Sequence, residues 1–164
     1  MEEIVIPQNI HSEKERYELL IKQIKTLLNP EDPEISNLSN LTATLKQTFD
    51  KVSWAGFYLF NNQKLFLGPF QGKVACTIIQ IGEGVCGTAA AKKETIIVPD
   101  VNKFEGHIAC DSESKSEIVV PMINRDGSLY GVLDLDSTEY ASFNETDKRY
   151  LEEICNFLVN EIIN

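Results

Sequence analysis

The stretch EIVVPMINRDGSLYGVLDLD, residues 117–136, decides the fold class of this chain. Its two apolar runs, residues 117–123 and 129–136, are separated by the segment NRDG at 124–127. An Asp-Gly pair between two such runs is a strong signal for a β-hairpin, because both residues tolerate the backbone angles of a tight turn. The stretch therefore predicts two antiparallel strands that pair with each other.

The second of these strands carries acidic residues at a regular spacing. Successive side chains of a strand point to opposite sides of the sheet. One predicted face holds Leu129, Leu133 and Leu135, and the other holds Tyr130, Val132, Asp134 and Asp136. Two residues along a strand span about 6.6–6.8 Å, so the two aspartates would line one face within reach of one small ligand. Glu117, which opens the partner strand, is a third candidate. The alternative for these acids is a solvated surface near the strand ends.

Outside this hairpin, the two ends of the chain have the apolar period of helices. Residues 12–29 and 35–49 each carry apolar side chains at spacings of three and four, and Ser12 is placed to cap the first helix. The same period runs through residues 144–163, where Asn144 is a good N-cap residue. We therefore expect two helices before the strands and one after them.

The segment between these helices predicts a sheet with one short helix inserted. Strands are expected in four further segments, residues 52–60, 64–67, 76–80 and 95–98, with a helix over 84–93 and a long loop over 101–114. This order predicts an α+β fold: a central antiparallel β-sheet of about six strands with the N- and C-terminal helices packed on one side.

The length of 164 residues fits one domain. We expect a single domain over residues 1–164, with a helical N-terminal segment at about 12–49, a sheet core at about 52–138 and a C-terminal helix at about 144–163.

Charge and hydropathy exclude several classes of partner. The 25 acidic and 15 basic residues give a net charge of −10, which disfavours a nucleic-acid or anionic-membrane partner because both need a basic surface. No apolar run approaches the ~18–20 residues of a membrane span. The N-terminal segment MEEIVIPQNIHSEKE has acids where a signal peptide would have a basic region. We therefore expect a cytoplasmic protein.

The four cysteines fall into two kinds. No Cys-x-x-Cys pair is present, so neither a zinc ribbon nor a thioredoxin-type motif is supported. Cys155 lies on the apolar face of the C-terminal helix and is expected to be a small buried apolar residue. The other three lie in polar or glycine-containing stretches: Cys76 in GKVACTIIQ, Cys86 in GEGVCGTAA and Cys110 in GHIACDSES. In the cytosol such thiols favour redox chemistry, and three inert thiols are the alternative.

Three further features could belong to a site. Trp54 and Tyr58 share one face of the strand at 52–60, either as a wall for a ligand or as ordinary core. Gly84 and Val85 open the short helix, where free N–H groups could receive a carboxylate, although the stretch is no Walker or dinucleotide motif. His107 precedes Cys110 by three residues and could lower the pKa of that thiol, complete a Cys₃His zinc site, or have no special role.

Three stretches of the chain resemble a known family. They are GPFQGKVACTIIQIGEGVCGTAA, VPDVNKFEGHIACDSESKSEIVVPM and YGVLDLDS, and the family is that of the free methionine-(R)-sulfoxide reductases, which are stand-alone GAF domains. The resemblance covers some 100 residues, from about Ser53 through Leu151. It implies a GAF fold and the reduction of free L-methionine (R)-sulfoxide to L-methionine.

The resemblance also implies a role for each motif residue. Cys110 would be the nucleophile that becomes a sulfenic acid, Cys76 the resolving thiol that forms a disulfide with it, and Cys86 an auxiliary cysteine of less clear role. The substrate-contacting acids would be Glu117, Asp134 and Asp136, and the aromatic wall Trp54 and Tyr58. For such a substrate, the free N–H groups at Gly84 and Val85 could receive the carboxylate.

The same resemblance implies partners. Thioredoxin would act as external reductant, no metal site and no metal or organic cofactor would be needed, and a homodimer would follow by analogy with related domains that pair through terminal helices. Two other readings compete with the reductase. One is a non-catalytic GAF sensor of a small molecule or of redox state. The other is a zinc-stabilised interaction domain that uses Cys76, Cys86, Cys110 and His107.

Overall fold

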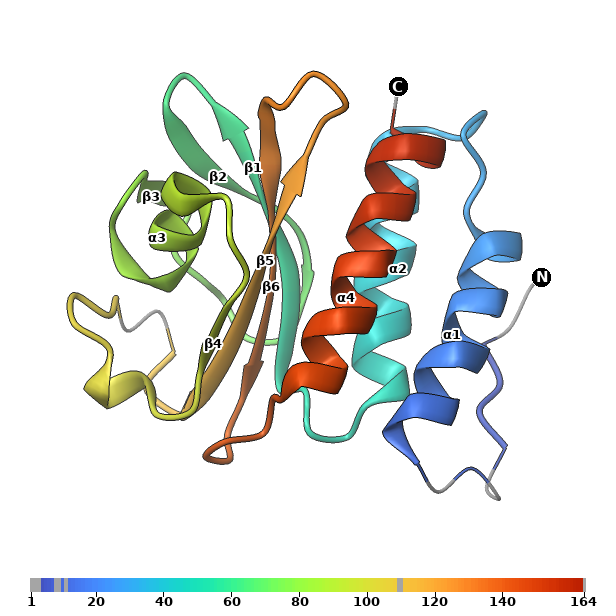
Figure 1. The fold of residues 1–164 in the computed structure, drawn as a ribbon, viewed down its shortest axis with the longest axis horizontal. Coiled ribbons are helices and arrows are strands. Elements are labelled where there is room, and N and C mark those ends of the chain that lie inside the picture. Colours follow the sequence, from blue (N-terminus) through green and yellow to red (C-terminus); the bar gives the residue numbers. More distant parts are fainter. Residues whose placement is uncertain (1–3, 8–9, 11, 109–110, 164) are drawn as a thin grey trace.

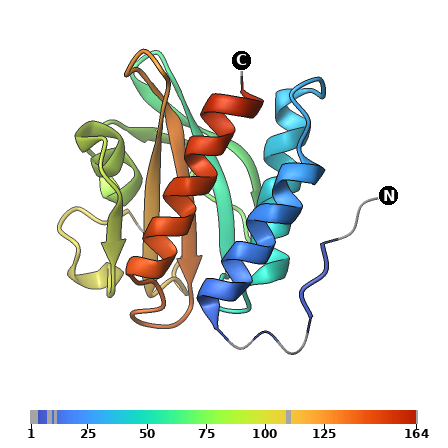
Figure 2. The same ribbon diagram turned by 45° about the vertical axis from the view of Figure 1, so that its right-hand side comes forward.

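The computed structural model describes residues 4–7, 10, 12–108 and 111–163 of the chain. One antiparallel sheet stands in the middle of the molecule, with helices on both of its faces (Figures 1 and 2). The helices are α1 (Glu13–Leu27), α2 (Glu34–Thr48), α3 (Gly84–Lys92) and α4 (Glu145–Phe157), with a 3₁₀ turn at Val101–Lys103 and a π-helical turn at Leu158–Ile162. The strands are β1 (Trp54–Asn61), β2 (Lys64–Gln71), β3 (Ile78–Gln80), β4 (Ile96–Val98), β5 (Ser116–Ile123) and β6 (Leu129–Ser137).

The sheet has the strand order β3-β2-β1-β6-β5-β4, and all of its pairs are antiparallel. The predicted hairpin is the pair β5–β6, and β1 lies on the other side of β6. Residues directly opposite each other in such a ladder place their side chains on the same face. Because Asp136 lies opposite both Trp54 and Glu117, this register brings three predicted site residues together.

Three helices cover one face of the sheet. α2 and α4 pack directly on the strands, and α1 lies outside them as a further layer (Figure 1). The core between them contains apolar side chains from every helix of this side and from the central strands, among them Leu20, Leu41, Phe57, Leu133 and Leu151. The predicted fold class is thereby confirmed, with the terminal helices on one side of a six-stranded sheet.

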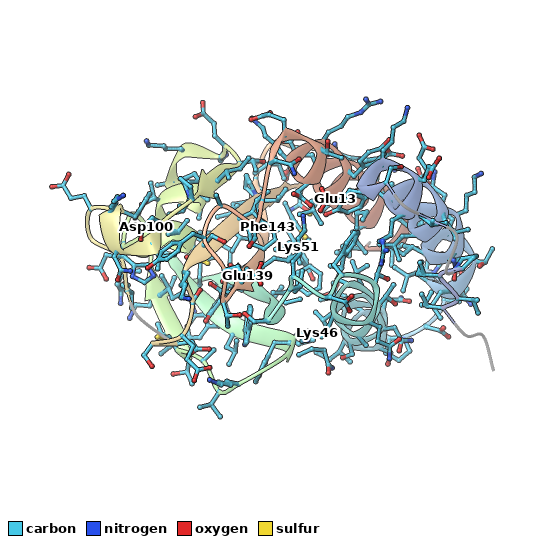
Figure 3. All side chains as sticks on the ribbon, turned by 90° about the horizontal axis from the view of Figure 1, so that it is seen from below. Glu13, Lys46, Lys51, Asp100, Glu139 and Phe143 are labelled. Atoms are coloured by element: carbon cyan, nitrogen blue, oxygen red, sulfur yellow. The ribbon has the colours of Figure 1, made fainter. Side chains whose placement is uncertain are left out.

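A buried polar cluster joins the beginnings of α1 and α4. Asn144 caps α4 and Ser12 caps α1, as the sequence predicts, and Asp147 completes a capping box with Asn144. The fully buried Asp147 carboxylate also accepts hydrogen bonds from Tyr17 (2.8 Å) and Lys51 (2.8 and 2.9 Å). Figure 3 shows Lys51 among these elements, where it also pairs with Glu13.

The predicted faces of Leu129 and Tyr130 are wrong, because β6 contains a bulge. Met122 pairs with Gly131 and Ile123 pairs with Leu129, so Tyr130 is an extra residue in the ladder. The side chains on either side of the bulge therefore exchange faces. Leu129 packs in the cluster beside α3, whereas Tyr130 packs on the helical side and donates a hydrogen bond to Glu34 (2.5 Å). Beyond the bulge, the alternation that places the two aspartates is as predicted.

The remaining differences concern element ends. β2 extends to Gln71 rather than ending near residue 67, and β3 begins at Ile78 rather than at residue 76. The expected loop over 101–114 contains the short 3₁₀ turn. Among the described residues, no helix is long and apolar enough to cross a membrane.

Candidate active site

A cavity lies on the face of the sheet opposite α2 and α4, beneath α3 and the segment that follows β4. Eight of the predicted site residues line it: Trp54, Tyr58, Gly84, Val85, Cys86, Glu117, Asp134 and Asp136. They come from β1, α3, β5 and β6, so the site forms only once the sheet has assembled. The structure thus brings together in one cavity residues separated by more than 80 positions in the sequence.

Three carboxyl groups gather on the floor of this cavity. Glu117 is 6% exposed and Asp134 5% exposed, so both are nearly sealed from water. Burial first, and then repulsion from the neighbouring acids, raises the pKa of both groups well above the ordinary value. Burial also raises the pKa of Asp136 to about 6, although the Ser114 hydroxyl, which donates a hydrogen bond to it, acts in the opposite direction. The cluster therefore retains protons at pH values where ordinary carboxyl groups have lost them.

Asp134 has an incomplete set of partners within the described part of the chain. Its Oδ2 lies 3.2 Å from the sulfur of Cys86, and its carboxyl group shares a side-chain hydrogen bond with Glu117, but no amino, amide or hydroxyl donor of the described residues reaches its buried Oδ1. A buried polar atom without a partner costs free energy, because water would have solvated it in the unfolded chain. Such an atom in a cavity indicates a place for a hydrogen-bond donor or a cation.

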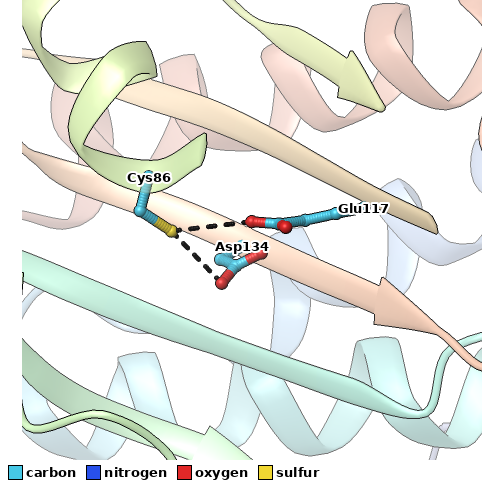
Figure 4. Close-up of side chains that lie close together, drawn as sticks. All are labelled: Cys86, Glu117 and Asp134. Atoms are coloured by element: carbon cyan, nitrogen blue, oxygen red, sulfur yellow. Dashed lines mark hydrogen bonds between the residues drawn. The ribbon is translucent and has the colours of Figure 1, made fainter. Parts of the chain in front are cut away.

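Cys86 points from α3 onto these acids (Figure 4). Its sulfur lies 3.2 Å from Asp134 Oδ2 and 3.9 Å from Glu117 Oε1. Burial, followed by the charges of Asp134 and Glu117, raises the pKa of the Cys86 thiol well above its ordinary value. The thiol therefore keeps its proton and donates it to Asp134, which is unlike a thiolate nucleophile.

The first turn of α3 forms another wall of the cavity. The helix begins at Gly84, whose φ of +60° is in the left-handed region that favours glycine, and the N-cap residue Glu83 makes no side-chain cap. The first N–H groups of a helix have no partner within the helix, and they attract an anion. Glycine at position 87 allows α3 to approach β3 closely. Any larger residue would place its Cβ only 2.2 Å from the carbonyl oxygen of Gln80.

Trp54 and Tyr58 form the aromatic wall and are also nearly buried. Their ring centroids lie 6.0 Å apart. The Trp54 indole N–H donates to the carbonyl of Lys73 (3.0 Å), and the Tyr58 hydroxyl donates to the carbonyl of Cys76 (3.0 Å). The wall is therefore attached to the segment that carries Cys76.

The other cysteines have different surroundings. Cys76 takes part in a disulfide bond. Cys110 lies outside the described residues, so its role stays a prediction. Cys155 is a free, buried thiol of α4 within the apolar core, which confirms its expected structural place. A disulfide sulfur is not a thiolate ligand, so this structure does not assemble the zinc set of Cys76, Cys86, Cys110 and His107.

Eight of the lining residues were not predicted as substrate-site residues, and three of them, His107, Asp111 and Ser114, are polar residues of the segment that follows β4. His107 Nε2 lies 4.0 Å from Glu117 Oε2, and burial lowers the pKa of the imidazole. Asp111 and Ser114 also line the cavity, and Ser114 holds Asp136 by the hydrogen bond described above. In the sequence these residues stand in a polar stretch that resembles a solvated loop. Only the return of that loop over the sheet shows that they face a cavity.

The comparisons with known proteins agree with this geometry. Residues 37–160 match the family model described as a GAF domain. The chain is 51% identical over 131 residues to the free methionine-R-sulfoxide reductase of Saccharomyces cerevisiae, and the alignment covers 76% of this chain and 73% of the relative. It is 42% identical over 140 residues to the enzyme of the same name from Escherichia coli, and that alignment covers 85% of this chain and 84% of the relative.

A solved structure shows the same fold. The free methionine-R-sulfoxide reductase from Neisseria meningitidis, determined in complex with its substrate, is 42% identical and superposes with a TM-score of 0.91. The match covers 96% of this chain and 93% of that one. The order of strands, the cavity and these similarities lead to one conclusion: the chain belongs to the GAF domain family and, within it, to the free methionine-R-sulfoxide reductases.

Proposed function

We propose that this protein reduces free L-methionine (R)-sulfoxide to L-methionine. The observation that carries the proposal is the composition of the cavity. One small space contains a buried acidic cluster, an aromatic wall and a helix N-terminus, and the wall is hydrogen-bonded to the backbone of the disulfide-bonded Cys76. The similarity to reductases at 42–51% identity supports the same activity.

Each part of the cavity matches one part of a free amino acid. The acidic cluster of Glu117, Asp134 and Asp136 accepts the ammonium group, and the unpartnered Asp134 Oδ1 is available to it. The N–H groups at Gly84 and Val85 receive the carboxylate. Trp54 packs against the S-methyl group. A methionine within a polypeptide has neither charge, so binding it would leave buried polar groups of the site unpaired, and the site rejects it.

The proposed reaction transfers the sulfoxide oxygen to a cysteine. The Cys110 thiolate attacks the sulfoxide sulfur while a carboxyl group of the cluster protonates the oxygen. Methionine leaves with a two-electron-reduced sulfur, and Cys110 becomes a sulfenic acid. The Cys76 thiol then displaces water from that sulfenic acid and forms the Cys76–Cys110 disulfide. The raised pKa values of Glu117 and Asp134 support a proton donor in the cluster.

The cycle closes when an external dithiol reduces the disulfide, and thioredoxin is the reductant that we propose. Thiols supply both electrons, so the reaction needs no metal or organic cofactor. A cytoplasmic location, which we also propose, would place the protein with that reductant. A homodimer through the terminal helices stays an expectation from analogy, and light scattering of the purified chain tests it.

The decisive experiment follows NADPH oxidation with thioredoxin, thioredoxin reductase and this protein. We expect turnover of free L-methionine (R)-sulfoxide and none of the (S) epimer or of the N-acetylated (R) form. Cys110→Ser should abolish turnover, whereas the matched variant Cys155→Ser should retain it, because that thiol of α4 lies within the apolar core.

The same experiment can overturn the proposal. If the free (R)-sulfoxide binds but is turned over with neither thioredoxin nor dithiothreitol, the protein is a non-catalytic sensor. Equal turnover of the N-acetylated form would instead contradict recognition of the two charges.

A further inference from the structure

We propose that the reduced protein binds one thiophilic divalent cation, such as Zn²⁺ or Cd²⁺, between the Cys86 sulfur and the carboxylates of Glu117 and Asp134. The ion is an inhibitor of the site and not a cofactor of the reaction. The three side chains come from α3, β5 and β6 and converge on one point of the cavity (Figure 4).

The spacing of the donor atoms fits a small tetrahedral ion. One donor atom from each of the three residues can be chosen so that all lie within 4.8 Å of one another. A zinc ion with Zn–S near ~2.3 Å and Zn–O near ~2.1 Å separates sulfur from oxygen by about 3.6 Å in tetrahedral geometry. The observed separations of 3.2 Å to Asp134 Oδ2 and 3.9 Å to Glu117 Oε1 lie on either side of that value. Shifts of about 0.3–0.4 Å would bring each of these two sulfur–oxygen separations to the tetrahedral value.

The charge of the cluster favours a cation. Within the described chain, neither Glu117 nor Asp134 forms an ion pair with a lysine or an arginine, and the closest basic group is His107 at 4.0 Å from Glu117. The buried Asp134 Oδ1 also has no partner among the described residues. A divalent ion would supply the counter-charge that these two buried carboxyl groups lack among the described residues, and it would take the place of the protons that they hold.

The cavity leaves room for the ion and for one more ligand. Its volume is about 40 Å³, against the roughly 10–15 Å³ that a single water needs. His107 also lines this space, 4.0 Å from Glu117, and imidazole nitrogen is a common metal ligand. His107 or a water would therefore complete the coordination. Binding breaks the S–H bond of Cys86, forms a metal–sulfur bond, and releases to solvent the thiol proton together with any proton that the two carboxyl groups hold.

The same acids receive the substrate ammonium in the proposed function. The cation and free methionine should therefore exclude each other, a consequence that rests on the proposed function. Binding of the metal by itself rests only on the geometry of the three side chains. Direct metal binding, measured without substrate, therefore tests this inference separately from turnover.

The test uses the full chain with Cys76→Ser and Cys110→Ser, so that Cys86 and Cys155 are the two remaining thiols. Cd²⁺ is titrated into the reduced protein, and the ultraviolet charge-transfer band of a cadmium–thiolate bond is recorded. We expect saturation at one ion per chain. Adding Cys86→Ser should abolish the band, whereas adding Cys155→Ser should leave it unchanged.

A second variant guards against a folding defect. In the same background, Asp134→Asn removes a buried charge and should weaken Cd²⁺ binding by at least tenfold with an unchanged far-ultraviolet circular dichroism spectrum. Free methionine should displace the ion, and N-acetylmethionine should not. No band in the double-serine protein, or a band that survives Cys86→Ser, would overturn the inference. If the band appears but methionine does not displace it, metal binding stands and the proposed substrate position falls.

Discussion

At the scale of single residues, the acidic cluster that we propose as the substrate site lowers the free energy of unfolding. The folded-state pKa of Asp134 lies above its value in the unfolded chain. Below the unfolded value the carboxyl group is protonated in both states and costs nothing. As the pH rises above the unfolded-state pKa, the carboxyl group ionises in the unfolded chain but not in the folded protein, and this favours unfolding. The effect stops growing once the pH passes the folded-state pKa. The destabilisation is therefore larger at pH 8 than at pH 4.5.

Asp134→Asn should accordingly stabilise the protein and impair it as an enzyme. We expect the free energy of unfolding at pH 8 to rise by about 1–2 kcal/mol and the gain to shrink at pH 4.5, in urea titrations with EDTA present. Turnover of the sulfoxide should fall at the same time. The matched variant is Glu94→Gln, which changes an exposed acid and should alter neither quantity. An equal gain at both pH values would contradict the assignment of buried, protonated carboxyl groups.

Gly56 supports the position of Trp54. A Cβ at this position would lie 2.3 Å from Trp54 Cη2 and 2.6 Å from Phe70 Cβ. Gly56→Ala should therefore displace the indole and lower the free energy of unfolding by about 1–3 kcal/mol. Trp54 is the sole tryptophan of the chain, so its fluorescence reports the displacement directly. Unchanged emission together with unchanged stability would show that the indole adapts without cost.

At the scale of elements, the sequence predicted the features that depend on neighbouring residues, such as strand alternation and helix caps. The alternation of β6 placed Asp134 and Asp136 on one face, and the capping residues placed the starts of α1 and α4. The bulge at Tyr130 escaped prediction, because it depends on how β5 and β6 pair and not on either strand alone. The role of Ser114 was not predicted for a related reason, because its contact with Asp136 depends on how the loop before β5 folds back over the sheet.

The start of α4 depends on a contact between elements. The Asp147 carboxylate accepts hydrogen bonds from Tyr17 of α1, from Lys51 and from the backbone of Asn144. Asp147→Ala would leave the Lys51 ammonium group, whose side chain is only 17% exposed, without its buried partner. We expect the free energy of unfolding to fall by about 3–5 kcal/mol. Denaturant titration measures it, and the matched variant Glu145→Ala, in the same first turn, should cost less than about 1 kcal/mol. If both variants lost the same free energy of unfolding, Asp147 would contribute no more than an ordinary residue of the first helical turn.

At the scale of the whole molecule, two faces of one sheet have separate tasks. The face under α2 and α4 holds most of the apolar core, whereas the opposite face holds the cavity. Two exposed apolar side chains lie on the rim of that cavity: Val74, which is 87% exposed, and Ile108, which is 37% exposed. Such side chains beside a disulfide are suited to contact the protein that reduces it.

A charge placed on this apolar rim should separate reduction by a protein from reduction by a small thiol. We expect Val74→Glu to raise the KM for thioredoxin by about tenfold, the equivalent of about 1.4 kcal/mol, because the substituted carboxylate meets an apolar contact. Turnover driven by dithiothreitol should change less than twofold, since a small thiol needs no docking surface. The matched variant is Ile35→Glu, which changes another exposed apolar residue, 58% exposed, in α2 on the other face of the sheet. If Val74→Glu slows both reductants alike, the rim shapes the substrate cavity instead, and the reductant approaches the disulfide from another side.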